Sequence, residues 1–259
     1  MIDIDELFNE YINEFIEENT GKLSVSDIEK RISELYAEFC NYKCEELGGL
    51  TPIEYLKTFE TKELLTVFKD GITSGESASE FLCEVLATRH DAEDELLKMA
   101  LSKDEELSVC AVNVLGAMGE EKSLNLFVQV LSEKKLPSNV CEVMTEALCS
   151  HADKVKESAI NAYNPNGIGA ESFEEVFSNM SKDERVFKLL YACFLNNKSN
   201  LAINASYLAK YGDERALTVL YSTIKRNDLS IIDYSEIKNA IEKLGGEVED
   251  DGRFVKNAH

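Results

Sequence analysis

Residues 107–131 read LSVCAVNVLGAMGEEKSLNLFVQVL, and residues 201–224 read LAINASYLAKYGDERALTVLYSTI. Both stretches space their apolar and glycine positions by four, then five, then seven residues, and the second lies 93 positions after the first, or three times 31. The matching positions are Leu115, Gly119, Leu124 and Leu131 in the first stretch and Leu208, Gly212, Leu217 and Ile224 in the second. A repeat of about 31 residues with helical spacing inside each unit is typical of an α-solenoid, in which antiparallel helix pairs stack and cover each other's apolar faces.

Three of the seven cysteines, Cys83, Cys110 and Cys141, recur at equivalent helical positions. Cys110 and Cys141 are 31 residues apart, and Cys141-Glu142-Val143 repeats Cys83-Glu84-Val85. The odd number of cysteines argues against a disulfide framework. Cys40 and Cys44 have the i, i+4 spacing of one helix face, but a zinc site needs further ligands and the three histidines lie far away in the sequence. We therefore expect core thiols and no metal site.

The first 60 residues predict a helical hairpin. Apolar residues recur with helical spacing from Ile4, and again after Ser24 or Ser26 as far as Gly48-Gly49. Thr51-Pro52-Ile53-Glu54 has the residues of a capping box with proline at the first helical position, so a short helix begins there. We expect residues 1–60 to pack on the array that follows rather than expose an apolar face.

Shorter helices follow from residue 61, separated by small breaks at Gly119, Pro137, Gly212 and Gly245-Gly246. Asp213 and Asp183 stand where caps should be. The predicted domains are therefore 1–60, the hairpin; 61–250, the repeats; and 251–259, a tail. The predicted helices are 61–72, 78–89, 91–102, 105–118, 121–134, 138–150, 152–163, 172–180, 183–196, 199–211, 213–227 and 234–244.

The formal net charge of −22 bears on the choice of partner. Residues 1–106 hold 27 acidic against 10 basic side chains, and residues 107–259 hold 22 against 17. An acidic first half favours a basic partner, although acidity also serves solubility alone. A chain this acidic is poorly suited to binding phosphate backbones, which requires clustered Lys and Arg. The sequence has no long apolar run and no basic, apolar leader, so we expect no membrane span and a cytoplasmic location.

One connection differs from the others. Residues 164–170 (NPNGIGA) form the Pro/Gly-rich stretch of the chain. Such a loop can carry a ligand, but a dinucleotide fingerprint would need a preceding strand and a third glycine. We interpret the stretch as an insertion between repeats and predict no cofactor.

Two segments resemble a known family. Residues 104–119 resemble the first helix of a HEAT repeat, and residues 205–217 are similar to the Leu-Gly-Asp-Glu-Arg-Ala-Leu turn of bacterial HEAT-like repeats, including those of phycobilisome lyases. The likeness spans about residues 75–250 and implies an all-α, HEAT-like or armadillo-like superhelix. HEAT-like families include scaffolds, regulators, lyases and DNA glycosylases, so the resemblance indicates architecture better than activity.

The function favoured by these patterns is a non-catalytic scaffold that binds a basic protein or peptide along a concave surface. Local motifs for a catalytic triad are absent, and neither His90 nor His151 has a catalytic setting in the sequence. The alternatives are a HEAT-like enzyme that handles a small molecule, as a lyase does, or an acidic mimic of nucleic acid. Aromatic anchors for a partner would be Tyr191, Tyr207, Tyr211 and Tyr221 if they line the binding face, although packing in the core is the commoner role of such residues.

Overall fold

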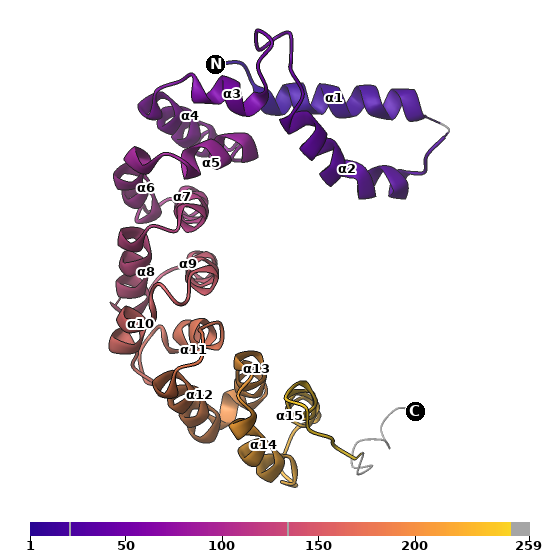
Figure 1. Cartoon of the computed structure of the whole chain (residues 1–259). Helices are drawn as coiled ribbons and strands as arrows, with labels where there is room; N and C mark the ends of the chain where they lie inside the picture. The colour runs from indigo at the N-terminus through magenta and orange to yellow at the C-terminus, as the bar shows by residue number, and fades with distance from the viewer. Residues whose placement is uncertain (21, 134, 250–259) are drawn as a thin grey trace. The chain divides into compact units, whose positions relative to one another are not determined.

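Helices make up the regular structure of the chain. A computed structural model describes residues 1–20, 22–133 and 135–249, and within these ranges no β-strand forms apart from one isolated bridge between Cys44 and Leu50. The chain divides into two compact units, Met1–Met118 and the residues from Gly119 onward (Figure 1). None of the helices in the described ranges is long and apolar enough to cross a membrane. The tail predicted at 251–259 lies outside the described residues.

The first unit contains two longer helices followed by shorter ones. Along the unit, α3, α5 and α7 are successive neighbours, while α4 packs on α5 and α7, and α6 packs on α7. The helices are α1 (Ile4–Asn19), α2 (Val25–Cys40), α3 (Pro52–Lys57), α4 (Thr61–Thr73), α5 (Glu80–Ala87), the short 3₁₀ helix η1 (His90–Ala92), α6 (Glu93–Ala100) and α7 (Glu105–Met118).

Side-chain caps start α1 and α3, and the sequence predicts the one at α3. Asp3 accepts hydrogen bonds from the backbone N–H groups of Asp5 and Glu6 at the start of α1, over 3.0 and 3.1 Å. The capping box of α3 is confirmed, because Glu54 N donates to Thr51 Oγ1 over 3.3 Å and Thr51 N donates to Glu54 Oε2 over 3.0 Å. Each cap satisfies backbone donors that the first helical turn leaves free.

The second helix is shorter than the sequence pattern predicts. It ends at Cys40 rather than continuing to Gly48-Gly49. The chain then folds back on itself, with Cys44 N donating to Leu50 O over 3.2 Å and Gly49 N donating to Cys44 O over 2.9 Å. Gly48 and Gly49 have φ of 70° and 79°, a backbone conformation that glycine adopts without strain. Cys40 and Cys44 therefore do not share a helix face, which corrects that interpretation.

An aromatic cluster joins the N-terminal hairpin to the helices that follow it. Phe81 of α5 is 1% exposed, and its ring centroid lies 5.9 Å from Phe8 of α1 and 4.9 and 5.7 Å from Tyr36 and Phe39 of α2. Aromatic pairs at these distances add stabilisation beyond the apolar area that they bury. The cluster shows why residues 1–60 belong to the same compact unit as α4–α7.

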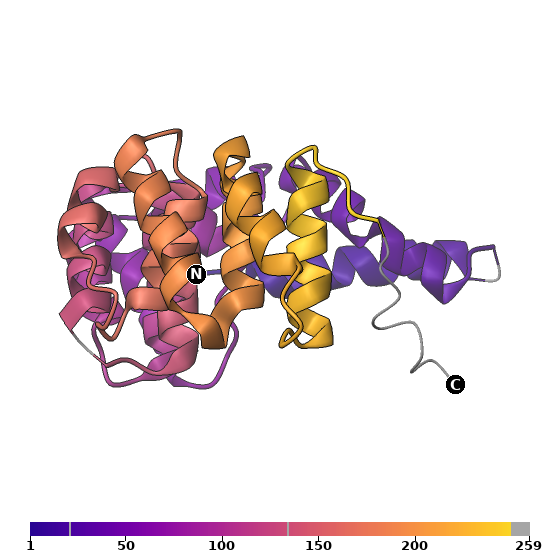
Figure 2. The same ribbon diagram turned by 90° about the horizontal axis from the view of Figure 1, so that it is seen from below.

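The second unit is built from helix pairs in two rows. In one row α9, α11, α13 and α15 are successive neighbours, and the helices of the other row pack against them, as α8 on α9, α12 on α11 and α13, and α14 on α15 (Figure 1). Figure 2 shows α13 and α15, in orange and yellow, standing side by side. The elements are α8 (Glu121–Glu133), α9 (Ser138–Ser150), α10 (Lys156–Ala162), α11 (Ala170–Ser178), α12 (Glu184–Asn196), η2 (Lys198–Asn200), α13 (Leu201–Tyr211), η3 (Glu214–Ala216), α14 (Leu217–Ile224) and α15 (Ile231–Lys243).

Every helix predicted between residues 61 and 244 has a counterpart in the structure. The differences are at the ends: three predicted helices begin with a 3₁₀ turn, and α10 begins four residues later than predicted. The glycine break predicted after α13 is confirmed, because Gly212 caps that helix with φ 74°. A left-handed cap of this kind is the common way to end a helix with glycine.

Polar contacts repeat between successive helix pairs of the second unit. Arg185 donates to Glu157 of the preceding pair over 2.6 and 2.9 Å and also to Asp183. Thirty residues later, Arg215 donates to Glu184 over 2.8 Å and to Asp213 over 2.8 Å. Asp183 and Asp213 also cap their helices, as the sequence predicts, by accepting from the backbone N–H of the arginine two residues on. We refer to these contacts as the arginine ladder.

Candidate binding groove in the N-terminal unit

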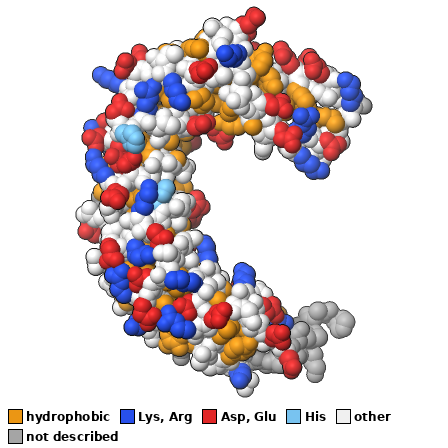
Figure 3. Space-filling model, in the orientation of Figure 1, with side chains coloured by type: hydrophobic (Ala, Val, Ile, Leu, Met, Phe, Trp, Pro, Cys, Tyr) orange, Lys and Arg blue, Asp and Glu red, His pale blue; other side chains and the backbone are white. Residues whose placement is uncertain are grey.

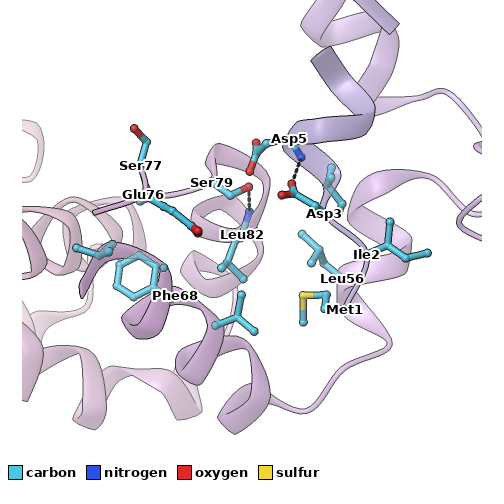
Figure 4. A pocket seen from close by; sticks show the side chains of 15 residues that line it. Met1, Ile2, Asp3, Asp5, Leu56, Phe68, Glu76, Ser77, Ser79 and Leu82 are labelled. Carbon is cyan, nitrogen blue, oxygen red and sulfur yellow. Dashed lines mark hydrogen bonds between the residues drawn. The ribbon is translucent and has the colours of Figure 1, made fainter. Parts of the chain in front are cut away.

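Two adjoining cavities lie between the starts of α1 and α5. The smaller has a volume of about 210 Å³ and the larger about 790 Å³. They share Asp3, Asp5 and the loop residues 76–79 as lining, so they form one continuous depression, which we call the acidic groove. α3 and α4 complete the smaller cavity (Figure 4). α2 completes the larger one.

The starts of α1 and α5 each have a side-chain cap and lie next to each other (Figure 4). Asp3 caps α1, and Ser79 caps α5 by accepting a hydrogen bond from Leu82 N over 3.5 Å. The Ser79 hydroxyl also bonds to the carboxylate of Asp5, and Figure 4 shows these two side chains next to each other. The loop that positions Ser79 is held by a bond from Glu76 N to Gly71 O over 3.0 Å.

Among the described residues, acids line the groove and no base does. Asp3, Asp5, Glu76 and Glu80 line it, and among the residues lining the two cavities there is no Lys, Arg or His. None of the four forms an ion pair with a described residue. Burial raises the pKa of Asp5, and the negative charges of Asp3 and Glu80 raise it further, against the opposing hydrogen bond from Ser79. Positive helix N-termini help to tolerate these acids, yet the side-chain charge of the groove stays uncompensated.

Apolar side chains are exposed beside the acids. Met1, Ile2 and Val67 are 50, 40 and 41% exposed at the smaller cavity, and Ile32 is 44% exposed at the larger one. Beneath them lies the buried core of the unit, including Phe68. Figure 3 shows apolar side chains interspersed with acidic ones over α1 and α2. Such a surface can hold a ligand that carries positive charge next to an apolar group.

The four tyrosines predicted as anchors all lie in the second unit, away from the acidic groove in the sequence. Tyr207 and Tyr211 are buried, at 9 and 4% exposure. The Tyr211 hydroxyl accepts from Asp183 N over 2.7 Å and donates to Asp183 O over 3.1 Å, so this ring joins two helix pairs. These two side chains belong to the core and present little surface to a partner.

The other two tyrosines are half-buried. Tyr221 accepts a hydrogen bond from Glu247 N over 2.9 Å and donates to Glu247 O over 3.1 Å, which attaches the segment after α15 to α14. The ring of Tyr191 packs against Phe187, with centroids 5.7 Å apart. Nothing in the structure brings these four residues together as one site.

The cysteines are free thiols in buried or half-buried positions. Burial raises the pKa of Cys83 and Cys149 to about 12, so both stay protonated at neutral pH. Across the described ranges, no three or more His, Cys, Asp or Glu side chains are grouped so that they could hold a metal ion.

Sequence reasoning alone did not find the acidic groove. Its lining comes from the first residues of the chain, from α2, α3 and α4, and from the loop and helix start at residues 76–82, which lie far apart in the sequence. A partial signal was present: the excess of acids lies in residues 1–106. The position of Ser79 as a cap was a second, weaker signal.

Comparison with known proteins does not assign the chain. No protein-family model matches it, and no curated protein matches its sequence.

Proposed function

We propose that the protein is a non-catalytic binding protein whose acidic groove takes up a basic segment of another protein. The observation that carries this proposal is the convergence of Asp3, Asp5, Glu76 and Glu80 on one groove that has no basic lining residue and has exposed apolar side chains. The segment that fits pairs an apolar side chain with flanking Lys or Arg.

The energetics favour such a segment on two grounds. Covering the exposed parts of Met1, Ile2, Val67 and Ile32 gains roughly 25 cal/mol for each Å² of apolar surface removed from water. The uncompensated carboxylates attract a cation from a distance, which speeds association and makes binding weaken as salt rises.

The architecture proposed for this scaffold is a HEAT-like α-solenoid. Supporting it are the sequence period of about 31 residues and the two-row arrangement of helix pairs in the second unit. The arginine ladder adds a contact that recurs with nearly the same period. We also place the protein in the cytoplasm, because all seven cysteines are free thiols.

The proposal is tested with a labelled peptide that alternates Leu and Lys, read by fluorescence anisotropy at low and at raised salt. We expect binding that weakens as salt rises, and a loss of about tenfold or more in the double variant Glu76→Lys/Glu80→Lys. The matched control is Glu105→Lys/Glu106→Lys, which makes the same charge change at exposed positions of α7.

Equal losses in both double variants would show that only net charge attracts the peptide and would reject the groove. Absence of binding to the wild-type protein at low salt would reject the proposed function itself. A peptide in which Glu replaces Lys serves as the negative probe and should not bind.

A further inference from the structure

The second unit contains a cavity of its own, with a volume of about 540 Å³. It lies between α10, α11 and α12, and the loop that contains residues 165 and 166 lines one side of it. Cavities of this size commonly hold small molecules. The lining residues are Ile160, Tyr163, Pro165, Asn166, Glu174, Leu189, Ala192, Cys193, Asn196 and Asn197.

A buried carboxylate lines this cavity. Glu174 of α11 is 4% exposed, and its Oε1 accepts a hydrogen bond from the Tyr163 hydroxyl over 3.0 Å. The same hydroxyl lies 3.0 Å from Cys193 Sγ, and the Cys193 thiol also hydrogen-bonds with Glu174. Burial raises the pKa of Tyr163 and raises that of Cys193 to about 12, so both groups keep their protons. Two neutral donors therefore hold the carboxylate.

No described cation accompanies the carboxylate. Among the residues lining the cavity there is no Lys, Arg or His, and the described partners of Glu174 are the Tyr163 hydroxyl and the Cys193 thiol. A carboxylate removed from water is costly unless a positive charge accompanies it. The cavity beside it leaves room for a ligand to bring that charge.

The rest of the lining suits a ligand with an apolar body. Ile160, Leu189 and Ala192 supply apolar surface, and the amides of Asn166, Asn196 and Asn197 supply further hydrogen-bonding groups. The ligand would therefore be polar at more than one point.

Hydrogen bonds within the loop at the side of the cavity, and its close approach to α8, fix its conformation. Gly167 N donates to Asn164 O over 2.8 Å, and Asn166 N donates to Asn164 Oδ1 over 3.0 Å. At Gly169 a side chain would collide with the carbonyl of Leu131 at the end of α8. The Pro/Gly-rich stretch therefore has a defined conformation that lines the cavity, which its interpretation as a simple insertion did not anticipate.

We propose that this cavity binds a small organic cation, with an ammonium or guanidinium group against the Glu174 carboxylate and an apolar stem against Ile160 and Leu189. The site lies wholly within the second unit and does not depend on the acidic groove. The same chemistry has two sources, a free amine and the side chain of a peptide lysine or arginine.

The test is titration calorimetry of the full chain with agmatine and putrescine, and with 1-butanol as a neutral probe. We expect the amines to bind and the alcohol not to bind. A separate arm uses arginine blocked at both its amino and carboxyl groups: tighter binding than agmatine identifies a peptide side chain as the source, and weaker binding identifies a free amine. If no cationic probe binds, the proposal is overturned.

The decisive variant is Glu174→Gln, which keeps the shape of the side chain and removes its charge. We expect it to lose at least about tenfold in amine affinity, while Glu175→Gln, the same change at the next position outside the cavity lining, keeps wild-type affinity. Unchanged affinity in Glu174→Gln, or an equal loss in Glu175→Gln, would overturn the proposal.

A stability measurement gives a second, independent readout. Without ligand, Glu174→Gln should melt at the same temperature as the wild-type protein or higher, because it removes a buried charge that lacks a cation. A marked drop in melting temperature without ligand would show that Glu174 is a structural group and would overturn the proposal.

Discussion

The two units treat their arginines and acids differently. In the second unit Arg185 and Arg215 pair with carboxylates of their own and the preceding helix pair. In the first unit Arg89, the residue directly before η1, donates instead to the backbone carbonyls of Lys57 and Phe59 over 3.1 and 3.2 Å. Arginine thus links successive helices in both units. In the second unit it does so through carboxylates, whereas in the first Arg89 uses backbone carbonyls and the ion pairs of Arg31 stay within α2.

This difference in arginine contacts explains which acidic side chains are available to bind a partner. In the arginine ladder, carboxylates pair with arginine. These acids therefore join successive helix pairs, and their negative charge is compensated. In the first unit, Arg89 uses backbone carbonyls and aromatic rings hold the hairpin to α5, and the four acids of the acidic groove form no ion pair with a described residue. The net charge of a segment does not show whether its carboxylates are paired with arginine.

The largest expected effect tests the aromatic cohesion of the first unit. Phe81→Ala should lower the free energy of unfolding by about 3–5 kcal/mol, because it empties a buried site in contact with three other rings. Urea unfolding measures the change. Leu101→Ala, at a position 42% exposed, is the control and should cost less than about 0.5 kcal/mol. A similar small cost for Phe81→Ala would show that the cluster does not hold the unit together.

A smaller effect is expected from the hydrogen bonds that join helix pairs in the second unit. Tyr211→Phe removes the hydroxyl that both accepts from and donates to the backbone of Asp183, so the Asp183 N–H loses its partner. We expect a loss of about 1–3 kcal/mol in unfolding free energy. Tyr191→Phe is the matched control, since its hydroxyl has no hydrogen bond to a described residue. Equal effects in the two variants would contradict the structural role assigned to Tyr211.

The smallest effects concern pH and should have opposite signs in the two units. The pKa of Asp213 is lowered, chiefly by its hydrogen bond from Arg215, so its contribution to stability is present above pH 3.8 and is lost as the pH falls through the lowered value. The pKa of Asp5 is raised, chiefly by burial, so its ionisation costs stability as the pH rises from 3.8 through the raised value.

Melting temperatures measured between pH 3 and pH 7 show whether the ionisation of each carboxylate stabilises or destabilises the protein. At pH 7, Asp213→Asn should be less stable than the wild-type protein and Asp5→Asn more stable, and both differences should shrink toward pH 3. Glu6→Gln, at an exposed position in the same helical turn as Asp5, controls for the loss of a charge near the helix N-terminus. If Asp5→Asn and Asp213→Asn shift stability in the same direction, the contrast between the units is wrong.

Local chemistry explains which parts of the fold the sequence predicts. Helix positions follow from apolar spacing, and the capping roles of Thr51, Asp183 and Asp213 follow from the residues beside them. The end of α2 was not predicted, because the apolar pattern runs on through Tyr42 while the backbone is drawn back by the bridge of Cys44 with Leu50.

Non-local contacts explain the rest. A helix in one of the two rows contacts helices on both sides and in the other row, so most of its circumference is apolar. Because of this wide apolar face, the spacing of apolar residues in the sequence does not distinguish a buried tyrosine from an exposed one. Tyr207 and Tyr211 are examples. Neither cavity was predicted, because the acidic groove and the cavity at Glu174 each combine side chains from separate helices and a loop. The Pro/Gly-rich stretch was recognised, but its place beside a buried carboxylate depends on α11 and α12.

The arginine ladder has a consequence for how such a chain can grow or shrink. Asp183-Glu184-Arg185 and Asp213-Glu214-Arg215 carry identical residues thirty positions apart. Removing residues 184–213 would leave Asp183 followed directly by Glu214 and Arg215, which re-forms the same tripeptide with Glu157 as the acceptor in the preceding pair. The arginine contact uses the same residue types at both positions, so duplication or loss of one such block of thirty residues would preserve this contact.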